Sequence, residues 1–387
     1  MSLKRKAAII GIADLKPQKD PAGETALSFC AKAAKLTVED AGLTKKDIDG
    51  LLVATTIDDF VPGFPSIVAE YLNIYPHYYD TVDIAGATAC GMAWRAASAI
   101  DHGLCQAVLC VAGDTVSIVN YYDEDWPLPS VEDEFDTPFG PMGINSAYAM
   151  IAKRHMYEYG TTSQQLAKIA VDQRTNACAN PNAYFYGKPI TIEDVLNSPL
   201  IVDPLHMLDI VMPVAGASAF VVVSPKLAQR AVHQPVWLLG AGEYCNHHVL
   251  SQAPSITTSA VAEASKTAYQ MAGLKPKDID IVELYDCYTI TVLISLEDTG
   301  FCRKGEGGKF VEITDLTYKG ELPCNTNGGQ LSFGQMGNNA GGMTHLTEAV
   351  RQLMGRGEER QVSGAKTALV NGNGDQMSQE CTIILGV

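Results

Sequence analysis

The chain has 387 residues, of which 47% are hydrophobic and 34 are glycines, and its formal net charge at pH 7 is −16. The length suffices for two domains, and the composition is typical of a close-packed α/β enzyme. The acidic balance argues against nucleic-acid binding as a main task, because proteins that bind phosphate backbones are usually basic. No apolar run approaches the roughly 20 residues that a membrane span needs, and the first residues lead into a strand rather than a signal-peptide cleavage site. We therefore expect a cytoplasmic protein.

Ten cysteines are scattered along the chain, and none of them form a Cys-x-x-Cys pair. A zinc or iron–sulfur site is therefore not expected, and the cysteines are interpreted as reduced thiols. Most of them are expected to be small buried residues, so the question is whether one of them is a nucleophile.

The chain contains an internal repeat with a long period. Residues 41–53 read AGLTKKDIDGLLV, and residues 272–284 read AGLKPKDIDIVEL. An apolar run precedes each copy, at residues 7–14 and 236–243, and the distance from run to copy is nearly the same in both cases. Each run contains a glycine and ends in an acid. Such runs predict buried strands. Two duplicated α/β halves are the simplest account of this self-similarity.

The repeat continues in the elements that follow. Gly42 and Gly273 stand where a helix would end, because glycine takes the left-handed backbone at low cost. Two further pairs of apolar runs match between the halves, namely 109–114 with 369–375 and 219–224 with 381–386. We therefore expect the same order of strands and helices in both halves.

About a hundred residues interrupt the first half and have no counterpart in the second. We expect this insert, at about 115–215, to form a loop domain that acts either as a lid or as a subdomain that shapes a substrate site. Thr162 or Ser163 is expected to cap a helix within it. The N-terminal half then spans residues 1–225, and the C-terminal half spans residues 234–387.

The first turn that could carry chemistry lies within residues 83–100, where a strand ends and an Ala-rich helix begins. The chain turns at Gly86, and Cys90 stands at the start of the helix. A side chain at such a turn lies near the helix N-terminal amides, which favour an anion or a thiolate.

Three further turns lie in the second half. Residues 283–298 predict a strand that ends at Tyr285 and Asp286 before a helix. A Gly/Asn-rich loop spans residues 325–342, and a tight turn spans residues 371–377. Loops of this kind bring backbone amides close to a ligand.

Four segments carry a resemblance to a known family. They are residues 158–185 and 188–209 in the insert, residues 283–310 (ELYDCYTITVLISLEDTGFCRKGEGGKF) and residues 325–337 (NTNGGQLSFGQMG). The chain resembles the thiolase superfamily over essentially its whole length, in the sterol-carrier-protein-type or lipid-transfer branch. The resemblance implies an α/β fold of two duplicated βαβαβαββ halves in a five-layer α-β-α-β-α arrangement, usually as a homodimer.

On this resemblance, the chain departs from the family at its catalytic positions. The position of the nucleophilic cysteine falls on Gly86. The His or Asn of the next motif falls on Tyr285, the His of Gly-His-Pro falls on Gln335, and the second cysteine falls on Asn371. The residues expected to line the substrate and oxyanion site are Gly86, Gly334, Asn371 and Gly372.

These changes alter the chemistry that the resemblance implies. Gly86 cannot be acylated, so retro-aldol cleavage of a β-hydroxyacyl-CoA, as in aldolases of the lipid-transfer type, is favoured over acyl transfer. Tyr285 would donate a proton or a hydrogen bond to the enolate oxygen, and Gln335 would polarise a carbonyl group. Asp286 would either orient a group or cap a helix, and the general base is not identified.

Two alternatives stay open. Cys90 is either a buried residue on a helix face or a nucleophile relocated by one helical turn, which would restore acyl transfer. The chain could also be a non-catalytic subunit that binds acyl-CoA or lipid within a complex. His345 is interpreted as a packed or capping residue.

The resemblance also implies the ligands and partners. We expect a coenzyme A thioester as the substrate, no covalently bound cofactor and no metal. A small partner protein with an OB fold and a zinc ribbon is expected for an aldolase of this type.

Overall fold

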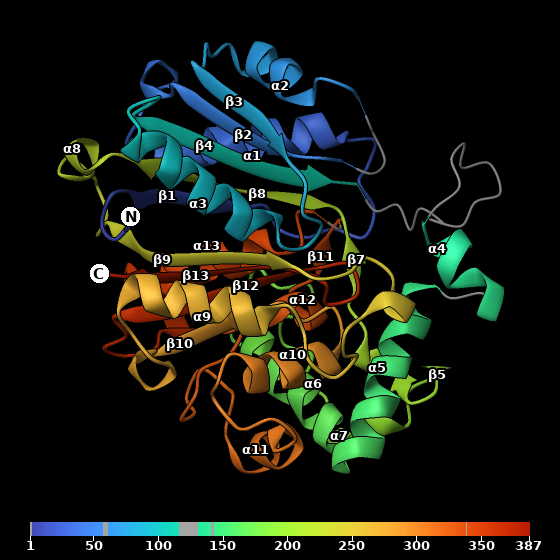
Figure 1. Ribbon diagram of the computed structural model, residues 1–387. Helices are drawn as coiled ribbons and strands as arrows, with labels where there is room; N and C mark the ends of the chain where they lie inside the picture. The colour runs from blue at the N-terminus through green and yellow to red at the C-terminus, as the bar shows by residue number, and fades with distance from the viewer. Residues whose placement is uncertain (1, 57–60, 116–130, 141–142, 338) are drawn as a thin grey trace.

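The structure is a computed structural model that describes residues 2–56, 61–115, 131–140, 143–337 and 339–387 (Figure 1). The first half forms strands and helices in the order βαβαβαββ. These elements are β1 (Ala8–Asp14), α1 (Ala26–Asp40), β2 (Gly50–Ala54), α2 (Phe64–Leu72), β3 (Tyr78–Val82), α3 (Thr88–Asp101), β4 (Ala107–Asp114) and β8 (Gly216–Val223).

The second half repeats this order with one difference. Its main elements are β9 (Val236–Cys245), α9 (Val261–Ala272), β10 (Ile281–Leu284), α10 (Thr289–Asp298), α13 (Met343–Leu353), β12 (Thr367–Gly374) and β13 (Gln379–Gly386). The third strand that the duplication predicts is reduced to one parallel bridge between Val282 and Cys324. The chain leaves the sheet there because Asn325 takes a left-handed backbone, with φ of 51°, and begins the Gly-rich loop.

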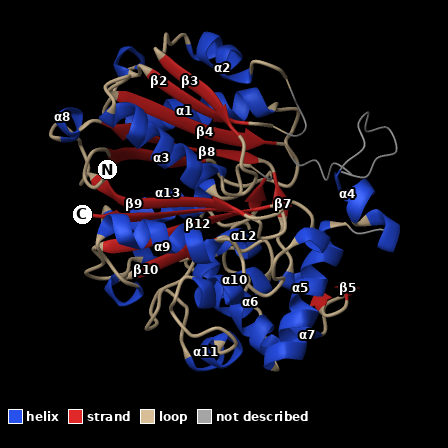
Figure 2. Ribbon diagram, viewed as in Figure 1, coloured by secondary structure: helices blue, strands red, loops and turns tan. Residues whose placement is uncertain are grey.

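The two halves share one nine-stranded sheet system in the order β10-β12-β13-β9-β1-β8-β4-β2-β3. They join where β1 pairs antiparallel with β9 over two residue pairs, Ala8 with Trp237 and Ile9 with Val236. The sheet bends around two central helices, and helices also cover its outer faces (Figures 1 and 2).

The layers follow from which faces are apolar. Helices α3 and α13 contact strands of both halves and each other, so they form the central layer. Helix α1 packs on β8 and β4, and α9 packs on β9 and β13, which gives the two outer layers. All eight residues of β4 and of β8 are buried, as expected for strands that are covered on both faces. The five-layer α-β-α-β-α prediction is confirmed.

The predicted helix ends are also confirmed. Helices α1 and α9 end at left-handed glycines, Gly42 with φ of 66° and Gly273 with φ of 71°. Thr162 is the residue that caps α6 (Ser163–Cys178), because its hydroxyl accepts a hydrogen bond from the Gln165 amide at 3.3 Å.

The insert in the first half packs against the second half. Its helices are α4 (Val131–Phe135), α5 (Ile144–Tyr159), α6 and α7 (Ile192–Leu196), followed by β5 (Leu200–Val202), β6 (Leu205–His206) and β7 (Pro213–Val214). Helix α6 contacts α10, α11 (Gly307–Ile313) and α12 (Gly329–Ser332). Two further short elements are α8 (Pro225–Ala228) and β11 (Gln335–Met336), and single 3-10 turns connect several of the other elements. Among the residues that the structure describes, no helix combines the length and hydrophobicity that a membrane crossing requires.

Candidate active site

Tyr285 lies at the end of β10 with its ring in the protein interior. Its backbone amide donates a hydrogen bond to the carbonyl oxygen of Asn371 at 3.0 Å, and 4% of the residue is exposed. Its hydroxyl accepts a hydrogen bond from Nε2 of Gln335 at 3.2 Å. Burial raises the pKa of Tyr285 far above its ordinary value, so the phenol is protonated at physiological pH.

Gln335 belongs to β11, which pairs with β7 of the insert. The pairing sets Gln335 opposite Pro213, and the Gln335 amide donates to the carbonyl oxygen of Met212 at 2.8 Å. The preceding Gly334 has φ of 120°, and a Cβ there would meet the side chain of Val214. The insert therefore fixes the direction from which the Gln335 side chain approaches Tyr285.

Gly86 packs directly against the Tyr285 ring. A Cβ at residue 86 would overlap the Tyr285 ring and the carbonyl oxygen of Asn373. Gly372 allows β12 to approach this turn, because a Cβ there would lie 2.6 Å from Cα of Ala87. The structure thus brings Gly86, Tyr285 and Gln335 together, and the aromatic ring fills the space into which a side chain at residue 86 would project.

The side chain of Asn371 points away from this group. Its Nδ2 donates to Oε2 of Glu380 at 2.8 Å, and its Oδ1 accepts from the Thr382 hydroxyl at 2.6 Å. Asn371 therefore reaches Tyr285 only through its backbone carbonyl oxygen.

Cys90 lies in the central layer against β12. Its Sγ is 3.7 Å from the carbonyl oxygen of Val370, and 1% of the residue is exposed. Burial raises the pKa of the Cys90 thiol well above its ordinary value, which keeps the thiol protonated and weakly nucleophilic.

Asp286 is fully buried, and it both caps a helix and contacts a side chain that it can orient. Its carboxylate accepts hydrogen bonds from the backbone amides of Gln330 at 2.8 Å and Leu331 at 3.1 Å, so it caps α12 rather than the helix that follows it in the chain. Its Oδ1 also lies 3.0 Å from Nε2 of His345.

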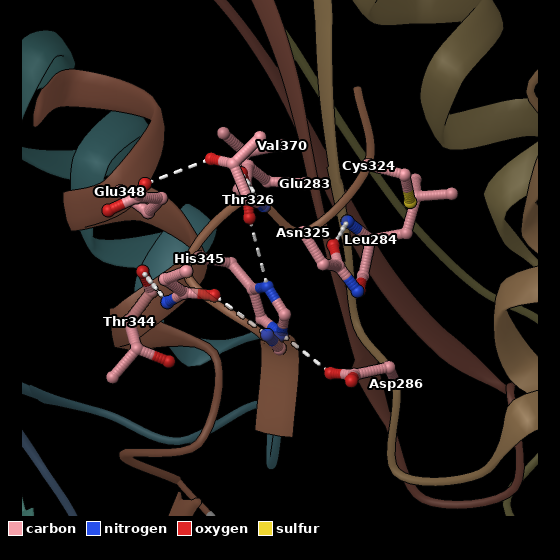
Figure 3. A network of polar contacts seen from close by, with 12 residues as sticks. Glu283, Leu284, Asp286, Cys324, Asn325, Thr326, Thr344, His345, Glu348 and Val370 are labelled. Carbon is pink, nitrogen blue, oxygen red and sulfur yellow. Dashed lines mark hydrogen bonds and ion pairs between the residues drawn. The ribbon is translucent and has the colours of Figure 1, made fainter. Parts of the chain in front are cut away.

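His345 on α13 is the site residue that the sequence did not reveal. Its ring lies between two carboxylates, with Nδ1 3.4 Å from Oε2 of Glu283 and Nε2 3.0 Å from Asp286 (Figure 3). Burial, the largest effect, favours the neutral ring, but the hydrogen bonds to Asp286 and Glu283 outweigh it and raise the pKa of His345 to about 9. The sequence signal for this site was the pair of acids that flank Tyr285, Glu283 and Asp286. Their common partner, His345, lies about 60 residues further along the chain, so the sequence alone did not connect them.

A second buried ion pair continues this polar chain. Glu283 accepts from the Thr326 hydroxyl at 3.1 Å, and that hydroxyl also lies 2.9 Å from Oε1 of Glu348. Arg360 binds Glu348 through two hydrogen bonds of 2.8 Å. No group of three or more potential His, Cys, Asp or Glu ligands is placed to hold a metal ion in the described part of the chain.

Comparison with known proteins identifies the scaffold. Residues 242–387 match the family described as "Thiolase C-terminal domain-like". The chain is 35% identical over 363 residues to the "Steroid side-chain-cleaving aldolase" of Thermomonospora curvata, and the match covers 90% of each chain. The chain belongs to the thiolase superfamily.

Other members of the superfamily match over most of their length. The "Acetyl-CoA acetyltransferase" of Methanothermobacter thermautotrophicus is 33% identical, with 87% of this chain and 88% of the relative covered. The solved structure described as "Ltp2-ChsH2(DUF35) aldolase" superposes with a TM-score of 0.89 at 33% identity, over 100% of this chain and 98% of the other. The chain is therefore a thiolase-family enzyme whose substrates are coenzyme A thioesters and whose chemistry concerns a carbon–carbon bond.

Proposed function

We propose that this enzyme is an aldolase-type lyase that cleaves a β-hydroxyacyl-CoA without a covalent intermediate. The observation that carries the proposal is the packing of the Tyr285 ring into the space beside Gly86. A phenol held by Gln335 thus occupies the place where acyl transfer would need a thiol.

The proposed reaction is a retro-aldol cleavage. A base takes the proton of the β-hydroxyl group, the β-carbon becomes a carbonyl carbon, and the Cα–Cβ bond breaks. Its electron pair moves into the thioester, which becomes an enolate. Tyr285, as a neutral phenol, and the Gln335 amide donate hydrogen bonds that stabilise the enolate oxygen, and protonation at Cα gives the shortened acyl-CoA.

The names of the relatives suggest the substrate class and a partner. One relative is named as a steroid side-chain-cleaving aldolase, so we propose a β-hydroxyacyl-CoA whose β-carbon carries a bulky ring system. The solved structure named with a DUF35 protein supports a small partner of that type, with the predicted OB fold and zinc ribbon. The homodimer and the cytoplasmic location stay predictions.

The decisive experiment compares Tyr285→Phe with the wild type, each co-expressed with a DUF35-type partner. Because the variant loses the hydroxyl but keeps the ring, kcat for release of the carbonyl product should fall roughly 10²- to 10⁴-fold, the usual range for a general acid. Liquid chromatography with mass spectrometry measures both the carbonyl product and the shortened acyl-CoA.

Tyr269→Phe is the matched control. Tyr269 is a tyrosine on α9 whose buried hydroxyl has no hydrogen-bond partner in the described residues, so its loss should leave kcat unchanged. Equal activity of Tyr285→Phe and the wild type would refute the assigned role of Tyr285.

Acyl transfer through Cys90 is the second candidate. Its buried, protonated thiol argues against it, and intact-protein mass spectrometry after incubation with acyl-CoA tests it. An acyl adduct that Cys90→Ala abolishes would favour transfer over cleavage. Binding of acyl-CoA without turnover, even with the partner present, would favour the non-catalytic alternative.

A further inference from the structure

We propose that His345 is a positioning residue for Tyr285. It is an imidazolium at neutral pH that fixes Asp286 and Gln330, and the Gln330 side chain in turn orients the Tyr285 hydroxyl. This inference rests on the proposed role of Tyr285 in catalysis.

The geometry favours a proton on both ring nitrogens of His345 when Asp286 and Glu283 are ionised. A neutral imidazole has one donor and one acceptor nitrogen, whereas an ionised carboxylate only accepts. Both oxygens of Asp286 accept hydrogen bonds from backbone amides, and Oδ1 lies 3.0 Å from Nε2 of His345. Glu283 lies 3.4 Å from Nδ1, and its other oxygen accepts from the Thr326 amide at 3.0 Å. An unprotonated nitrogen would therefore face a carboxylate oxygen on one side.

The surroundings of the ring contain charges of both signs. Burial raises the pKa of Glu283 to about 7, against the hydrogen bond from His345 that lowers it. Titratable and charged groups surround the His345 ring and the carboxylates near it. They come from the strand, the loops and α13 itself, and they are Glu283, Tyr285, Asp286, Cys324, Glu348, Arg351 and Arg360. The pair of Glu348 with Arg360 is internally neutral, so it leaves His345 as the cation that balances the two nearer acids.

Gln330 links the imidazolium to Tyr285. Its backbone amide donates to Asp286 at 2.8 Å, and its Nε2 lies 3.3 Å from Nε2 of His345. Its Oε1 is buried and has no hydrogen-bond partner in the described residues. Nε2 of His345 lies closer to Asp286, at 3.0 Å, so the ring holds Asp286, which in turn holds the backbone of Gln330.

Gln330 and Gln335 determine the hydrogen bonds of Tyr285. Nε2 of Gln335 donates to the phenol oxygen at 3.2 Å, and the Gln330 side chain is also within hydrogen-bonding reach of the Tyr285 hydroxyl. The two amides hold the phenol oxygen and leave its proton to donate to the enolate oxygen. His345 itself is 0% exposed, so it acts through these neighbours and not on the substrate.

The first test observes the protonation state directly. Long-range ¹H–¹⁵N correlation of ring-labelled histidine should show both His345 nitrogens in the imidazolium range from pH 6 to 8, with the signals assigned by their absence in His345→Gln. A neutral tautomer at pH 7 would overturn the proposal. This result does not depend on any substrate, so it stands or falls separately from the retro-aldol assignment.

The second test separates positioning from stability. His155 is the control, because it is also fully buried and also contacts a carboxylate. Its Nδ1 lies 2.8 Å from the Thr161 hydroxyl, and its Nε2 lies 3.1 Å from Oε2 of Glu297. His345→Gln should lower kcat roughly 10- to 100-fold with KM within about twofold, in the range that a small misplacement of a catalytic group produces. His155→Gln should lower stability but leave kcat unchanged.

Gln330→Met keeps the test decisive if His345→Gln does not fold. It removes the amide at similar volume and leaves the buried charges intact, and it should lower kcat by a similar factor with KM retained. A wild-type kcat in Gln330→Met would contradict the link from His345 to Tyr285. If the wild type itself cleaves no β-hydroxyacyl-CoA, the proposed function fails, and the resonance experiment still decides the state of His345.

Discussion

At the scale of single residues, the contact between Gly86 and Tyr285 determines what the site can do. A Cβ at residue 86 would collide with both the Tyr285 ring and the Asn373 carbonyl oxygen, and a backbone oxygen cannot move aside as a flexible side chain can. Glycine is therefore the only residue that fits at position 86 while the Tyr285 ring and the Asn373 carbonyl oxygen lie where they do.

We expect Gly86→Ala to lose about 1–3 kcal/mol of stability, the usual cost of overpacking, together with most of its activity. Urea denaturation and the cleavage assay measure the two effects. Gly103→Ala is the control for activity, because nothing lies within 4 Å of a Cβ at that position; its left-handed φ of 74° should cost roughly 1–2 kcal/mol of stability while activity is retained. A Gly86→Cys variant that folds normally and forms an acyl-enzyme would contradict this account of the site.

The family resemblance placed Gly86, Tyr285 and Gln335 at catalytic positions, and the structure brings the three residues together. The direction of the Asn371 side chain was not predicted. Strand alternation could have indicated it, because Asn371 lies on the same face of β12 as Leu369, which packs in the outer layer. His345 could not be assigned, because its role depends on α13 packing against β10, and no local pattern encodes that contact.

At the scale of elements, α13 introduces opposite pH responses into the core. His345 and Glu283 have pKa values raised to about 9 and about 7, so their stabilising effect is complete below their unfolded values of 6.5 and 4.5 and is lost as pH rises. Glu348 has the reverse response: burial alone would raise its pKa, but Arg360 outweighs this and lowers the pKa to about 2. Its contribution is therefore present above pH 4.5 and is lost in strong acid.

The free energy of unfolding should accordingly fall as pH rises, through Glu283 from about 4.5 to 7 and through His345 from about 6.5 to 9. It should also fall as pH drops below about 4.5, through Glu348. Urea titrations at several pH values measure this curve. His345→Gln should flatten the alkaline limb, because the variant has no imidazolium to lose, while His155→Gln should retain it. Parallel alkaline limbs in wild type and His345→Gln would show that His345 does not titrate in this range.

Helix ends were predictable from single residues such as Gly42 and Gly273, because a left-handed terminus has a local cause. The missing third strand of the second half was not, because the repeat predicts a strand there. The bridge at Cys324 survives alone because Asn325 turns the chain toward the loop that carries Gln335.

At the scale of the whole molecule, ion pairs tie the two halves together. Arg95 on α3 binds Glu243 on β9 at 2.7 Å, Arg356 after α13 binds Asp40 at 2.8 Å, and Arg351 binds Asp14. The central layer consists of one helix from each half. Each half alone would therefore expose a large apolar face.

We expect the fragments 1–225 and 234–387 to be unfolded or aggregated when expressed separately, and to form a soluble complex when co-expressed. Circular dichroism and size-exclusion chromatography distinguish these outcomes. Cooperative unfolding of either fragment alone would show that the halves are independent domains, and it would test the predicted boundaries at the same time.

The placement of the insert has a consequence during synthesis on the ribosome. Helix α6 ends at Cys178, whereas α10, which it packs against, begins at Thr289. At roughly 5–20 residues per second, translation leaves an interval on the order of ten seconds before the covering surface exists. During that interval the apolar side chains of α6, such as Leu166 and Ile169, remain without their native neighbours. The nascent chain therefore offers a binding site to chaperones, and slower translation of the second half would prolong that exposure.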